Sequence, residues 1–100
     1  MLFAFAAWAD SGAETYDRLC KSCHGADGKG NEAKAKILKI DAERMNLGRA
    51  EAAGRTKEQT KDIVSKGKDK MPAYEKKLKP EEIDPVVEYA MGLAKAARGK

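Results

Sequence analysis

Apolar residues recur at helical spacing in three parts of the chain, and glycine-rich or charged segments separate them. In the first part, residues 12–20, Tyr16 and Cys20 lie one helical turn apart. Ser11, just before this part, and Glu14, within it, have the spacing of a capping box. The pattern therefore predicts a helix over residues 12–20.

A second capping box, formed by Thr56 and Gln59, opens the next predicted helix. This helix should bury Ile63 and Val64 and end at Gly67, because glycine commonly follows the last helical turn.

The chain ends in a longer predicted helix that starts with Pro80 in its first turn. Pro85 has no N–H to donate, so the helix either kinks there or restarts with Asp84 as its N-cap. Its expected inner face consists of Val86, Tyr89, Ala90, Leu93 and Ala97.

The segments between these helices carry weaker signals. Residues 25–31 are dense in glycine and are expected to form a loop. Residues 33–40 suit either a short helix or an extended stretch, residues 41–55 are expected to be irregular, and residues 68–77 should form another loop. The sequence thus predicts an all-α domain of three to five helices.

At 100 residues the chain is long enough for one domain, with a net charge of +4. The positive charge favours partners with acidic docking surfaces. No aromatic residues interleave the lysines, so we expect no nucleic-acid binding. Nothing in the sequence suggests an oligomer, and we expect a monomer.

Residues 1–9 carry no charge and are too short to span a membrane. They end in Ala7-Trp8-Ala9, which has the small-residue pattern of a signal-peptidase site, although the basic start of such a signal is missing. We interpret residues 1–9 as a signal-peptide remnant or a hydrophobic N-terminal arm, and residues 10–100 as the domain. The first interpretation predicts a periplasmic or otherwise exported protein.

Both cysteines and the only histidine lie within Cys20-Lys21-Ser22-Cys23-His24. This spacing is typical of c-type haem attachment, in which the two thiols add to the haem vinyl groups and the histidine binds the iron. Three alternatives remain. A zinc site would need a fourth ligand, a redox dithiol would sit near a βαβ pattern, and a disulfide across so short a loop would constrain little.

A second axial ligand cannot be a histidine, so methionine, lysine or water remains. Met71 is the first candidate, because it lies in a turn-rich loop that Pro72 stiffens. The alternative is that Met71 fills a gap in the core, and Met45 is the second candidate ligand.

Taken together, these motifs resemble the class I c-type cytochromes, over roughly residues 11–97. The resemblance rests on four segments in order: Gly12-x-x-x-Tyr16-x-x-x-Cys20, Cys20-x-x-Cys23-His24-Gly25, Met71-Pro72-Ala73-Tyr74 and Ile83-x-x-Val86-Val87-x-Tyr89. It implies a cytochrome c-like fold wrapped around one covalently attached haem c.

The resemblance also assigns roles to particular residues. Cys20 and Cys23 would tether the haem, and His24 and Met71 would ligate its iron. Gly12 would let the first and last helices touch, with Tyr16 and Tyr89 packed at their crossing.

Two further expectations concern the surroundings of the haem. Arg44 should lie near the propionates and either pair with one or remain in solvent. The family commonly orients its histidine through the carbonyl of a proline, but this chain has no proline before Pro72. Another carbonyl, near Lys36, should accept the bond from His24.

The resemblance implies a single-electron carrier that shuttles electrons between redox partners. The alternative is a haem-based gas or redox sensor in which Met71 is labile. No nucleophile and base are paired in the sequence, so we expect no enzymatic activity. Lysines on both sides of Met71 are expected to ring the haem edge and to dock acidic partners: Lys66, Lys68, Lys70, Lys76, Lys77 and Lys79.

Overall fold

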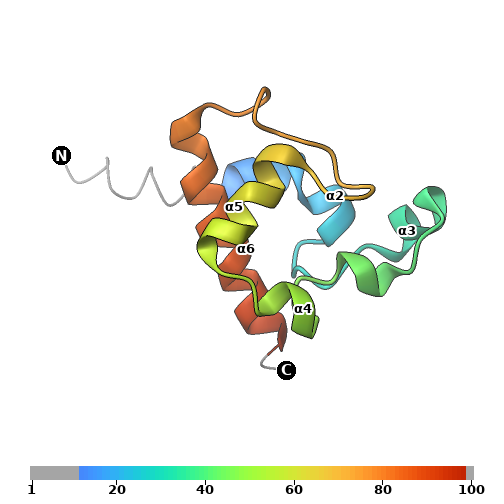
Figure 1. Cartoon of the computed structure of the whole chain (residues 1–100). Helices are drawn as coiled ribbons and strands as arrows, with labels where there is room; N and C mark the ends of the chain where they lie inside the picture. The colour runs from blue at the N-terminus through green and yellow to red at the C-terminus, as the bar shows by residue number, and fades with distance from the viewer. Residues whose placement is uncertain (1–11, 99–100) are drawn as a thin grey trace.

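The structure, a computed structural model, describes residues 12–98, and within them the chain is helical with connecting loops (Figure 1). A first helix covers residues 12–19. The remaining elements are α2 (Lys21–His24), α3 (Glu32–Leu38), the 3-10 helix η1 (Ala42–Met45), α4 (Ala50–Ala53), α5 (Lys57–Lys66) and α6 (Pro80–Arg98). The predicted all-α fold is confirmed.

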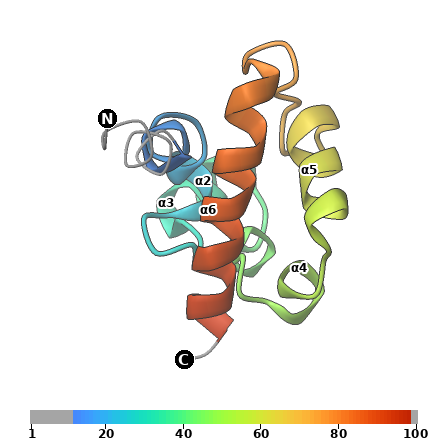
Figure 2. The ribbon, with the colours of Figure 1, turned by 90° about the vertical axis from the view of Figure 1, so that its left-hand side faces the viewer.

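The long helix α6 is the element around which the others pack. Figure 2 shows it running through the middle of the molecule, with α5 on one side and the helix of residues 12–19 on the other. Val86 and Val87 on α6 are completely buried. They form one core with Tyr16, Val64, Leu78 and Ile83.

The helix of residues 12–19 meets α6 backbone against backbone. A Cβ atom on Gly12 would lie 2.6 Å from the carbonyl oxygen of Pro85, so only glycine fits at this contact. One turn further along each helix, the rings of Tyr16 and Tyr89 lie 5.3 Å apart between centroids, a favourable distance for an aromatic pair. The expected crossing is confirmed.

Pro85 lies inside one continuous helix, so a restart at Asp84 is wrong. Asp84 instead forms an ion pair with Lys61 of α5, at 3.2 Å. Two other details of the predicted inner face differ. Val87 belongs to it, because it is completely buried, and Tyr89 remains 37% exposed while its ring packs on Tyr16.

The predicted capping box of Thr56 and Gln59 is confirmed by both of its hydrogen bonds, and α5 ends before Gly67 as expected. Val64 is buried, whereas Ile63 is half-buried and lines a cavity. The other predicted box includes Ser11, which lies outside the described residues.

The expectation that residues 41–55 are irregular is wrong, because this segment forms η1 and α4. The side chain of Asp41 accepts a hydrogen bond from the N–H of Glu43 and so caps η1. Helices of four residues are too short to show a hydrophobic period. Residues 33–40, whose sequence suits either a short helix or an extended stretch, are largely helical: α3 is capped by Asn31 and ends at Leu38.

Between residues 12 and 98, no helix has both the length and the apolar composition needed to cross a membrane.

We expect Gly12→Ala to destabilise the protein, because its methyl group must displace the Pro85 carbonyl or the helix itself. Forcing an extra carbon into a close-packed contact costs about 1–3 kcal/mol. Chemical denaturation of the haem-loaded protein measures this loss.

Gly92→Ala is the control: Gly92 lies on α6, the helix that Gly12 contacts, and a Cβ there would meet nothing within 4 Å. Alanine is the better helix former, so this variant should gain about 0.5–1 kcal/mol. Equal effects of the two substitutions would show that the Gly12 contact is not tight.

Candidate haem-binding site

One cavity of about 300 Å³ brings all four predicted site residues together: Cys20, Cys23, His24 and Met71. The cavity lies between α2, η1 and the loop that follows α5. Apolar side chains form much of its wall, and they are Leu19, Leu38, Ile40, Met45, Ile63, Pro72 and Tyr74. Such a wall suits a large apolar ligand with a few polar contacts.

The two cysteines lie at the junction between the first helix and α2. The N–H of Cys20 donates to the carbonyl of Tyr16 and the N–H of His24 donates to the carbonyl of Cys20, so the chain stays helical across the motif. Both thiols are free and half-buried. Burial, with a smaller contribution from Cys23, raises the pKa of the Cys20 thiol to about 11.

His24 is held by a backbone carbonyl. Its Nδ1 lies 2.7 Å from the carbonyl oxygen of Met45. Because a carbonyl can only accept, Nδ1 carries the proton and Nε2 keeps a free lone pair for a metal. Burial lowers the pKa of His24, so the neutral form that can bind a metal is favoured.

The expected carbonyl near Lys36 is therefore wrong. The Lys36 carbonyl accepts instead from Lys39, at the end of α3. The carbonyl of Met45 becomes available because η1 folds back against the glycine-rich loop. A Cβ atom on Gly30 would lie 2.7 Å from the carbonyl oxygen of Ala42, so this approach also requires glycine.

The two candidate methionines occupy different parts of the wall. Met45 is 5% exposed and belongs to the segment whose carbonyl holds His24. Met71 is half-buried and ends a tight turn, in which Lys68 and Met71 exchange backbone hydrogen bonds of 3.0 and 2.9 Å. The turn belongs to the loop that follows α5 (Figure 1), and its residues line the cavity.

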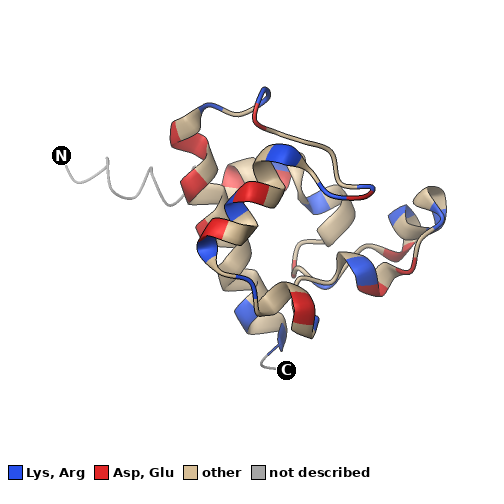
Figure 3. Ribbon diagram, viewed as in Figure 1, with Lys and Arg blue, Asp and Glu red and all other residues tan. Residues whose placement is uncertain are grey.

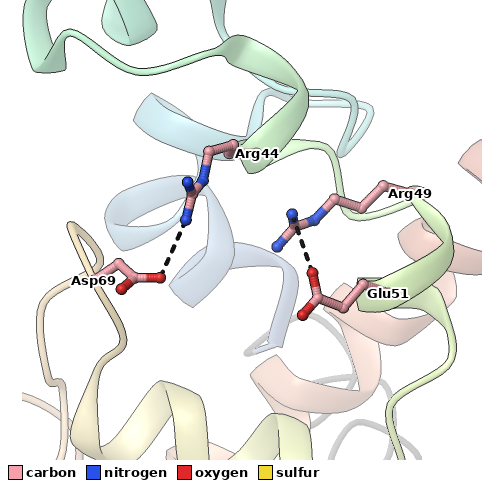
Figure 4. Close-up of polar contacts among 4 residues, drawn as sticks. All are labelled: Arg44, Arg49, Glu51 and Asp69. Carbon is pink, nitrogen blue, oxygen red and sulfur yellow. Dashed lines mark hydrogen bonds and ion pairs between the residues drawn. The ribbon is translucent and has the colours of Figure 1, made fainter.

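Arg49 is a site residue that the sequence analysis missed. It lines the cavity, its side chain is only 23% exposed, and its Nε atom is buried without a hydrogen-bond partner. Its NH1 atom lies 3.5 Å from Glu51 (Figure 4). No sequence signal marked it, because the short helix α4 that follows it was not predicted.

Arg44, the expected propionate partner, also lines the cavity but already pairs with Asp69 at 3.3 Å (Figure 4). Arg49 has the unsatisfied N–H, and a haem propionate would satisfy it. The apolar wall, the thiol pair, the oriented imidazole, the thioether and this orphaned Nε together fit a haem.

The six lysines around Met71 are all exposed, but they do not form an even ring. Lys68 and Lys70 line the cavity, and the other four do not. Lys66 pairs with Asp62 at 3.4 Å, and the ammonium of Lys77 lies over the ring of Tyr74. Figure 3 shows basic residues spread along the loop rather than gathered at one point.

The described residues assemble no group of three or more histidine, cysteine, aspartate or glutamate side chains that could hold a metal ion. Within residues 12–98, the fourth ligand that the zinc alternative requires is therefore not provided.

Comparison with known proteins finds c-type cytochromes. Residues 7–89 match the family described as "Cytochrome C oxidase, cbb3-type, subunit III". The chain is 34% identical to cytochrome c6 of Nostoc sp. strain PCC 7120, with 93% of this chain and 78% of that protein aligned. It is 37% identical to cytochrome c6 of Anabaena variabilis, with 88% and 96% aligned.

The solved structure of the KustC0563 c-type cytochrome is similar in fold, with a TM-score of 0.66. The two are 25% identical in sequence, and the match covers 82% of this chain and 95% of the other. The chain therefore belongs to the family that its residues 7–89 match, and it is a small class I c-type cytochrome. It carries one covalently attached haem c and functions as a monohaem electron carrier.

Replacing Arg49 with glutamine should lower the midpoint potential, because a cation near the haem disfavours the ferric state. The expected shift is on the order of tens of millivolts, measured by redox titration followed in the visible spectrum.

The control for Arg49→Gln is Lys95→Gln, which removes one charge from α6 at a position that does not line the cavity. A shift of the same size in both variants would show that Arg49 acts only through the net charge.

Proposed function

We propose that the haem of this electron carrier is tethered by Cys20 and Cys23 and that its iron is bound by His24 and Met71. The observation that carries this assignment is the shared cavity, which all four residues line, together with the Met45 bond at Nδ1 that leaves Nε2 of His24 free. When bound, the haem supplies the one-electron chemistry, because its iron exists in ferric and ferrous states.

The chain's own residues hold and shield that group. The carbonyl of Met45 fixes the orientation of the His24 ring, as outer partners of metal ligands generally do. The apolar wall limits the access of water, and thioether ligation favours a high potential.

Met71 is the better candidate for the second ligand. The Met45 carbonyl lies at Nδ1, the ring nitrogen that points away from a metal on Nε2. The backbone of Met45 thus lies on the side of the His24 ring that carries Nδ1, away from Nε2. Met71 comes from a separate segment of the wall, beyond α5.

An electron carrier explains the site without any enzymatic activity, and the sensor alternative has no observation in its favour. We assign residues 10–100 to one domain that acts as a monomer. Residues 1–9, as a signal remnant or N-terminal arm, lie outside the described residues. Export to the periplasm or an equivalent compartment fits their sequence, and cell fractionation tests it.

Docking of acidic redox partners fits the cavity mouth best at Lys68 and Lys70, since these two exposed lysines border the cavity. Positive charge there would steer an acidic partner and raise its association rate more than its affinity.

Met71→Ala should open the iron to carbon monoxide in the ferrous protein and lower the midpoint potential, because a thioether ligand is lost. Rapid-mixing spectroscopy of the holoprotein measures the binding. Met45→Ala should leave the iron closed to carbon monoxide, although the loss of a buried side chain destabilises the fold by about 2–5 kcal/mol. The reverse pattern would identify Met45 as the ligand.

Changing both Lys68 and Lys70 to glutamate should slow electron transfer with an acidic partner at low ionic strength, without altering the visible spectrum. The matched control changes Lys76 and Lys79, which lie on the same loop but do not line the cavity. If the control pair slows transfer as much as the first pair, the docking surface is not centred on the cavity mouth.

A further inference from the structure

The pair formed by Arg44 and Asp69 connects two walls of the haem cavity that otherwise belong to separate segments. Arg44 lies on η1, next to the residue whose carbonyl holds His24, and Asp69 lies in the turn that ends at Met71. The Arg44 NH2 atom and the Asp69 carboxylate are 3.3 Å apart, and Figure 4 shows them facing each other. Both residues line the cavity.

The turn is anchored unequally on its two sides. After Met71, the N–H groups of Tyr74 and Glu75 donate to the carbonyls of Val64 and Ser65 on α5. The hydroxyl of Tyr74 donates to the carbonyl of Leu19. The stretch after Met71 is thus held from two directions.

Before Met71, the tip of the turn has one such anchor. Among the polar contacts that the structure describes, only one joins residues 68–70 to a segment outside the turn. This contact is the bond between Asp69 and Arg44. Asp69 itself has a positive φ of 55°. Aspartate adopts this left-handed conformation more readily than most residues.

We propose that Asp69 and Arg44 form a clasp that positions Met71 at the iron and slows its release. This inference rests on the proposed function, in which Met71 is the ligand. For an external ligand to reach the iron, Met71 must leave it, and the clasp opposes any movement of the turn that carries Met71 away from η1. The two side chains are 55% and 61% exposed, so salt weakens the clasp.

The test measures how fast imidazole binds the ferric holoprotein, since imidazole enters only after Met71 has left. Asp69→Asn removes the charge and keeps a residue that tolerates a positive φ. We expect the binding rate to rise about two- to fivefold, the range that an exposed ion pair supports. Raising the salt concentration should speed binding in the parent protein and have little effect in the variant.

Arg44→Gln should have the same effect, and the double variant should show no further increase, because either substitution breaks the same contact. Arg44→Lys, which keeps the charge, should retain most of the slow binding. Asp62→Asn is the matched control: it breaks the equally exposed Asp62–Lys66 pair on α5, outside the cavity, and should leave the rate unchanged.

Rates that stay at the parental value in Asp69→Asn and Arg44→Gln, or that add in the double variant, would overturn the clasp. A change in Arg44→Gln alone would overturn it too and would point to a propionate as the partner of Arg44. Met71→Ala distinguishes a failure of the ligand assignment from a failure of the clasp. If it fails to speed imidazole binding, the ligand assignment is wrong. If it succeeds while Asp69→Asn does not, only the clasp is wrong.

Discussion

The hydrogen bond between His24 and the Met45 carbonyl fixes the geometry on which the site depends. It joins α2, which contains Cys23 and His24, to η1, which contributes the backbone carbonyl of its last residue. The approach of η1 depends on the glycine-rich loop, where Gly30 meets the Ala42 carbonyl and the Gly28 carbonyl accepts from Leu47. A segment that looks like a simple connector thus determines which nitrogen of the histidine is free.

The cavity wall that contains Met71 is held by different contacts. The segment with Met71 is a loop that packs at the edge of the core through Met71 and Tyr74, and backbone hydrogen bonds to α5 and one tyrosine hydroxyl hold it. Local opening is easiest where few apolar contacts are buried. The histidine side of the cavity is therefore set by close backbone contacts around one hydrogen bond, and the methionine side by bonds to α5 and by partly buried side chains at the edge of the core.

Much of the fold could be predicted because its signals are local. The capping box at Thr56, the helix face containing Tyr16 and the glycine contact at Gly12 depend on short spacings or on a family pattern. Three of the residues that line the cavity could be predicted for the same reason, since one short motif contains every cysteine and the histidine. The Met45 carbonyl and Arg49 could not be found this way. A backbone acceptor has no sequence signature, and the role of Arg49 depends on a four-residue helix that propensity does not mark.

The contact between Gly12 and Pro85 joins the two ends of the described chain, and this has a consequence for how the protein is made. The helix that closes the core, α6, is synthesised after every other described element, so the core of Tyr16 and Val86 cannot assemble until that helix has been made. Contacts between such distant segments also form late, because a long loop must close first. Until then Cys20 and Cys23 lie on an open chain. The interval before these distant segments meet is therefore the period in which both thiols are most accessible.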